Sequence, residues 1–130
     1  MANVISNVFK QELLKGNHDF DGGATYKIAL YTSSKTATAS DPTAYNTTNE
    51  QANTGTYAAG GGTLANASVT GGSSATITAR YAQIYRSDGS APTNNSVCVL
   101  DFGGNFTTTS GTFTIQFPSA STSTAILRLA

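Results

Sequence analysis

The sequence lacks several residue types on which catalytic, secreted and membrane proteins depend. It has no tryptophan, one cysteine and one histidine, and only 11% of its residues are charged, against about 25% in an ordinary soluble domain. The lone Cys98 excludes a disulfide within the chain, and its apolar neighbours indicate a small buried side chain. Seven basic residues balance seven acidic ones, which argues against a nucleic-acid partner because phosphate binding needs clustered Lys and Arg.

Long apolar runs are missing as well. A membrane-spanning helix needs about 18 consecutive apolar residues, and no window of the chain approaches that length. A secretory signal needs an uninterrupted apolar core, whereas Lys10, Glu12 and Lys15 interrupt the apolar residues near the N-terminus. We therefore expect no membrane partner and assembly in the cytoplasm.

Large apolar side chains are also few, since only 24 of the 130 residues are Leu, Ile, Val or Phe. A chain of this length predicts a single domain, here over 1–130. Its surface must be built mainly from Thr, Ser, Asn and Gly. A core with so few large apolar side chains leaves a small domain only marginally stable unless partners bury more of its surface. We therefore expect a homo-oligomer, or a scaffold of other proteins on which the domain is bound.

Start and stop signals for one helix lie near the N-terminus. Asn3 can cap the first turn and Gly16 can take the left-handed position after the last one, which predicts an N-terminal helix over 1–16. Its apolar side chains fall on one broad arc. These candidate interface residues are Val4, Ile5, Val8, Phe9 and Leu13. Two interpretations stay open: the arc closes one end of the domain's own sheet, or it packs against a neighbouring subunit.

From residue 24 onward the apolar period changes to two, which is typical of strands. The predicted strands are 26–31, 63–70, 75–86, 96–102, 111–117 and 122–129. The stretch 33–62 has few apolar anchors and many Gly and Asn residues, so it is predicted to be a long loop and a contact surface, with a short edge strand near 56–58. The fold class is therefore mainly β: an antiparallel β-sandwich or flattened barrel over 24–130, with one N-terminal α-helix.

The most chemically suggestive cluster is His18-Asp19-Phe20-Asp21. Two carboxylates could hold a calcium ion, but an EF-hand loop starting at Asp19 would place Leu30 at its twelfth position, where a Glu is needed. We interpret the cluster as an Asx-rich turn anchored by Phe20, and we expect no metal site, cofactor or catalytic residue.

Six tyrosines raise the possibility of sugar binding, because aromatic faces can stack on sugars. Tyr81 and Tyr85 are predicted to share one face of a strand, where packing within the sheet is the competing interpretation.

Five segments carry a resemblance to a known family: the opening MANVISNVFKQELLKGNHDF, the strand YKIALYTSS, the run ATITARYAQIY, the turn VLDFGG and the ending GTFTIQFPSASTSTAILRLA. As a set they resemble small virion structural proteins of tailed bacteriophages, and the match is loosest over 33–74. The resemblance implies a non-enzymatic virion protein that assembles in the host cytoplasm with the major capsid protein or other virion proteins. Cement or decoration of the capsid is the first role implied, and a tail or head-to-tail component is the second.

Overall fold

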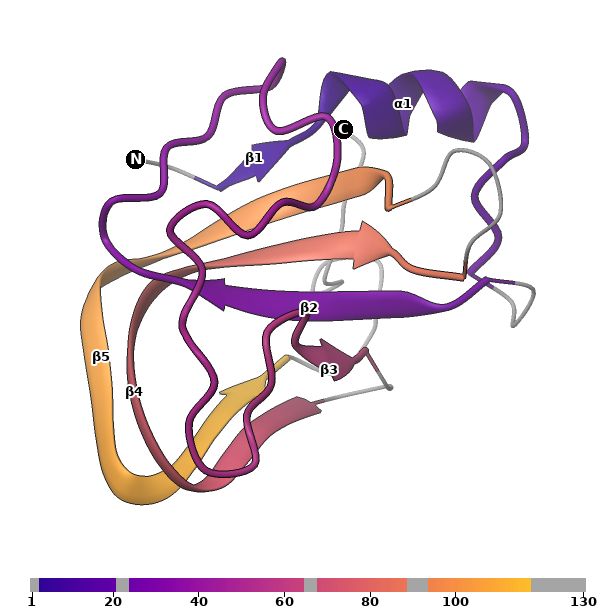
Figure 1. The fold of residues 1–130 in the computed structure, drawn as a ribbon. Helices are drawn as coiled ribbons and strands as arrows, with labels where there is room; N and C mark the ends of the chain where they lie inside the picture. The colour runs from indigo at the N-terminus through magenta and orange to yellow at the C-terminus, as the bar shows by residue number, and fades with distance from the viewer. Residues whose placement is uncertain (1–2, 21–23, 65–67, 89–93, 118–130) are drawn as a thin grey trace.

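The computed structural model describes residues 3–20, 24–64, 68–88 and 94–117, which form one antiparallel sheet and one short helix (Figure 1). The elements are β1 (Val4–Ile5), α1 (Asn7–Leu14), β2 (Tyr26–Tyr31), β3 (Gly62–Thr63), β4 (Ser68–Arg86) and β5 (Ser96–Gln116). The strand order across the five-stranded sheet is β1-β5-β4-β2-β3. The predicted mainly-β antiparallel fold with a helix near the N-terminus is confirmed. Within the described ranges, no helix has the length and apolar character needed to cross a bilayer.

The two long strands dominate the sheet. β4 has 19 residues and β5 has 21, whereas the sequence predicted two shorter strands in each place. The predicted breaks at Gly71-Gly72 and Gly103-Gly104 are wrong, because the strands continue through both and the register shifts instead, as between Gly71 and Ala75. Glycine within a strand can bend the ladder without ending it. In Figure 1 the two strands curve sharply together and fold back over the rest of the sheet.

The sheet has two packed faces. The larger core is formed by aliphatic and aromatic side chains from every long element, including Phe9, Ile28, Ile77, Ile84 and Phe113. The opposite face carries a smaller cluster, which we call the tyrosine cluster and which comprises Ala29, Tyr31, Ala37, Tyr81, Tyr85 and Val99, with Tyr45 packed against it. The sheet therefore buries side chains on both faces.

The predicted long loop is present between β2 and β3, and it lies along the outer edge of β2. The Gln51 N–H donates to the Leu30 carbonyl at 2.9 Å, and the Thr32 N–H donates to the Asn49 carbonyl at 3.0 Å. The Leu30 N–H donates to the Tyr57 hydroxyl, also at 2.9 Å. The predicted edge strand near 56–58 is only an isolated bridge in which Tyr57 takes part, so β3 forms the edge of the sheet. The strand predicted at 122–129 lies outside the described residues.

Candidate functional site

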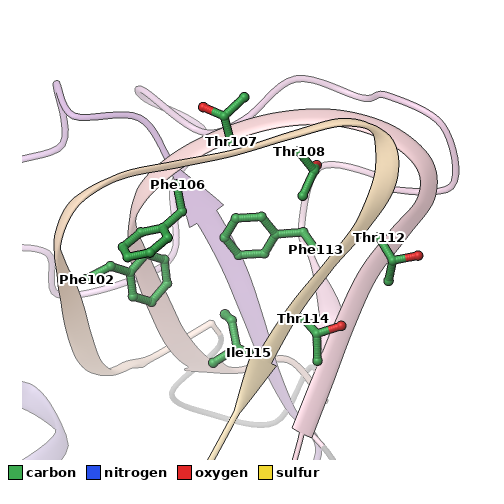
Figure 2. Close-up of a pocket in the computed structure, with 8 residues that line it drawn as sticks. All are labelled: Phe102, Phe106, Thr107, Thr108, Thr112, Phe113, Thr114 and Ile115. Atoms are coloured by element: carbon green, nitrogen blue, oxygen red, sulfur yellow. The ribbon is translucent and has the colours of Figure 1, made fainter.

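An apolar pocket lies on the inner side of the bend in β5. Its volume is about 560 Å³, and none of the lining residues that the structure describes has an ionisable side chain. The lining residues are Phe102, Phe106, Thr107, Thr108, Thr112, Phe113, Thr114 and Ile115. Figure 2 shows the phenylalanine rings turned toward one another within the curve of the strand, above Ile115. We call this site the bend pocket.

The bend pocket keeps a large apolar side chain in contact with water. Phe106 is 55% exposed, although its ring meets that of Phe102 edge to face, with centroids 6.2 Å apart. Phe113, by contrast, is buried on the core side. A pocket with phenylalanine walls and threonine hydroxyls suits an apolar side chain from a partner, because burying apolar surface is the main source of association free energy.

The predicted helical arc is only partly helical. Val4 and Ile5 form β1 and pair with Val99 and Cys98 of β5, so placing them on a helix was wrong. Asn3 does not cap a helix either: its side-chain oxygen accepts a hydrogen bond from the Asp101 N–H at 2.8 Å. β-branched residues beside an open strand gain more from the ladder than from a helical turn.

The remainder of the arc lies on α1, which begins after Ser6 and packs beside β5. Phe9 is fully buried in the chain's own core, while Val8 and Leu13 are half-buried. Leu14, which falls outside the predicted arc, is 90% exposed. The end of the helix is as predicted, because Gly16 takes a left-handed φ of 75°. Phe9 thus closes the domain's own sheet.

Phe9 packs against a buried histidine. His18 Nδ1 lies 3.1 Å from the Tyr26 hydroxyl and His18 Nε2 lies 3.1 Å from Asn95 Oδ1. The amide oxygen can only accept, so Nε2 carries the proton and Nδ1 accepts from Tyr26. Burial lowers the pKa of His18, and this outweighs the Asn95 hydrogen bond, which raises it. His18 is therefore a neutral structural residue that joins α1 to β2 and to Asn95, the residue before β5.

The rest of the predicted turn is less buried. Phe20 stacks on Tyr26 with ring centroids 4.5 Å apart, as expected of an anchor, yet it stays 55% exposed. Asp21 lies outside the described residues. Among the residues that the structure describes, no group of three or more His, Cys, Asp or Glu side chains could hold a metal ion.

Cys98 occupies the interior of β5, as predicted. It is 2% exposed, and burial raises the pKa of its thiol to about 12. Because the thiolate is the nucleophilic form, the Cys98 side chain remains a neutral, unreactive thiol at physiological pH.

The two tyrosines considered for sugar stacking are buried in the tyrosine cluster. Tyr81 is 5% exposed and Tyr85 is 3% exposed. The ring of Tyr85 stacks on Tyr45 at 4.4 Å, and its hydroxyl donates to the Gly60 carbonyl at 2.7 Å. Packing within the chain is therefore their role, and their ring faces are not free for a sugar.

Glu50 lies within the long loop and joins Tyr45, which packs on the tyrosine cluster, to Gly60 farther along the loop; this role was not predicted from the sequence. Its carboxylate accepts hydrogen bonds from the Tyr45 hydroxyl and the Gly60 N–H, both at 2.5 Å. The bend pocket was missed too, since Phe106 falls between two of the predicted strands and was given no role. The signal that could have found the pocket is Phe-Gly-Gly-Asn-Phe over 102–106, where two aromatic residues flank a flexible step between predicted strands.

Comparison with known proteins adds no relative: no protein-family model matches the chain, and neither a curated protein nor a solved structure is significantly similar to it.

Proposed function

We propose that this protein is a non-enzymatic structural component of a tailed-bacteriophage virion, and that it cements the capsid by binding the shell of the major capsid protein. The resemblance of the five sequence segments supports the virion assignment. The bend pocket supports attachment, because its exposed phenylalanine lies on a neutral surface that is otherwise rich in Thr, Ser and Asn. We also propose that the protein is a homo-oligomer.

The role as cement can be tested by copy number. Quantitative mass spectrometry of purified virions should find this protein in amounts comparable to the major capsid protein, because a cement protein repeats with the lattice of the shell. A much lower copy number, together with co-purification with tail proteins, would support a tail or head-to-tail component and reject the cement role.

The attachment surface can be tested by substitution. Phe106→Thr removes the exposed ring and keeps a residue that suits a strand, so we expect the variant to fold and to bind capsids at least tenfold more weakly. Leu14→Thr is the matched control, since it removes a more exposed apolar side chain from α1. Capsid binding measured by co-sedimentation should be unchanged in the control. Loss of binding in Leu14→Thr alone would move the attachment surface to the helix.

A further inference from the structure

One lysine is buried without a carboxylate partner. Lys35 is 5% exposed, in the first part of the loop after β2. No carboxylate oxygen of the described residues lies within the ion-pair distance of 4.0 Å from its Nζ. The Nζ instead lies 3.9 Å from the centroid of the Tyr31 ring and donates a hydrogen bond to Gln83 Oε1 at 3.4 Å. An amine in such a site needs an explanation, because buried charges are normally paired.

The acceptor of that hydrogen bond is a fully buried amide. Gln83 is 0% exposed, in the middle of β4. Its Oε1 is also 3.1 Å from the Tyr31 hydroxyl, which it shares as a donor with the Asn46 carbonyl at 2.7 Å. Its Nε2 donates to the Ala44 carbonyl at 3.3 Å. The amide is thus held in one orientation, with a hydroxyl donor on its carbonyl oxygen and its amino group directed away from the lysine.

We propose that Lys35 and Gln83 form an intramolecular isopeptide bond. The neutral amine of Lys35 attacks Cδ of Gln83, so that a bond forms between Nζ and Cδ. The bond between Cδ and Nε2 breaks, and Nε2 takes up a proton released from Nζ and leaves as ammonia. If the lysine starts as an ammonium, its additional proton leaves with the ammonia. No oxidant, reductant or other reactant is needed.

The site favours this reaction in three ways. Burial lowers the pKa of Lys35, against the smaller opposing effects of Asp41 and Glu50, which increases the fraction of free amine. The Tyr31 hydroxyl donates at 2.7 Å to the Asn46 carbonyl and lies 3.1 Å from Oε1, so a turn of its single proton toward Oε1 would stabilise the negative charge that develops there. The amine and the amide are held in contact, with Nζ 3.4 Å from Oε1, and holding two reacting groups together lowers the barrier to an otherwise slow reaction.

The bond would join two segments that are distant in the sequence. Lys35 and Gln83 are 48 residues apart, and the bond would fasten the start of the long loop to β4. In a chain with a single cysteine, it would supply the kind of covalent constraint that disulfides give to small domains.

Intact-mass spectrometry of the purified folded protein tests the proposal. We expect a mass lower than the sequence mass by one ammonia, about 17 Da, and a branched peptide containing Lys35 and Gln83 after proteolysis. Tyr31→Phe keeps the ring and removes the hydroxyl, so it should form the bond more slowly. A folded wild-type protein with the full sequence mass, or with Gln83 converted only to Glu, would overturn the proposal.

Two variants separate this bond from other losses of ammonia. Lys35→Arg keeps the positive charge and removes the primary amine, so its mass should equal its sequence mass. Lys27→Arg, in β2, is the matched control and should still lose ammonia. If Lys35→Arg also lost 17 Da, cyclisation of an asparagine elsewhere would account for the change and the proposal would be wrong. Circular dichroism of each variant verifies that it folds.

Discussion

Phe9 shows how a single side chain fixes the position of the helix. It is fully buried and its ring meets that of His18 edge to face, with centroids 4.8 Å apart. Phe9→Ala should therefore lower the free energy of unfolding by about 3–5 kcal/mol, as is usual when a buried phenylalanine is truncated. Urea unfolding followed by circular dichroism measures this change. Leu14→Ala, at a position that is 90% exposed, should change stability by less than about 0.5 kcal/mol. Equal effects in the two variants would contradict the assignment of Phe9 to the core.

His18 makes stability depend on pH. Its pKa in the folded protein is lowered, chiefly by burial and also by Arg86, despite the opposing effects of Asn95, Glu12 and Asp88. Below the ordinary histidine pKa of about 6.5, the unfolded chain therefore takes up a proton that the folded chain does not, and acidification favours unfolding. Stability should be fully present above about pH 6.5 and should fall as the pH drops toward the folded pKa.

The measurement is the thermal midpoint between pH 7.5 and pH 5. We expect the midpoint to fall on acidification in the wild type and to fall less in His18→Gln, which keeps hydrogen-bonding capacity without a titratable ring. Glu12 does not contribute to the change between pH 7.5 and pH 5, because its pKa is lowered from an ordinary value of 4.5. A midpoint that rises on acidification would show that His18 is stabilised as the cation.

At the scale of single elements, β4 shows what periodicity can and cannot predict. Ile77, Ala79, Tyr81 and Tyr85 follow one another with a period of two in the sequence, which predicts that they share one face of the strand. The structure puts Ile77 and Ala79 in the larger core and the two tyrosines in the tyrosine cluster. A register shift between Ala79 and Tyr81 separates them, since such an irregularity in the ladder can move the following side chains to the other face.

The elements predicted correctly are those whose conformation is determined by nearby residues in the sequence. β2 occupies the predicted range, Tyr26–Tyr31, because its alternation and its flanking turn residues are signals within the strand itself. The predicted helix began too early in the chain. Val4 and Ile5 take an extended conformation because they pair with β5, almost a hundred residues away. The bend pocket could not be predicted for the same reason: it depends on how two strands curve together, which no short window of sequence contains.

The connection into β3 depends on one glycine. Gly61 has a φ of 72°, and a Cβ there would overlap the backbone oxygen of Ile28. Gly61→Ala combines a left-handed strain of about 1–2 kcal/mol with a backbone clash, so it should lower the free energy of unfolding by at least that amount. Gly104→Ala is the control, because nothing lies within 4 Å of its Cβ position. Urea unfolding should give a lower free energy of unfolding for Gly61→Ala and a nearly unchanged one for Gly104→Ala. A free energy of unfolding that is unchanged in Gly61→Ala would contradict this role.

At the scale of the whole molecule, the balance between core and surface bears on assembly. The core is small and rich in alanine, and three of the large apolar side chains in the described residues are exposed: Leu14, Phe20 and Phe106. Sedimentation equilibrium of the purified protein should give a multiple of the 13.3 kDa chain mass. A monomer that stays stable at every concentration would contradict the proposed homo-oligomer and leave the capsid as the partner to be tested.

The hydrogen bonds between the long loop and β2 have a consequence for solubility. An exposed strand edge is a template on which a second chain can add a strand and begin a fibril. Here the Leu30 N–H and C=O are already occupied by Tyr57 and Gln51, so this part of β2 offers no free ladder to another molecule. The loop therefore prevents a second copy of this chain from adding a strand at this part of β2 and beginning an amyloid-like aggregate.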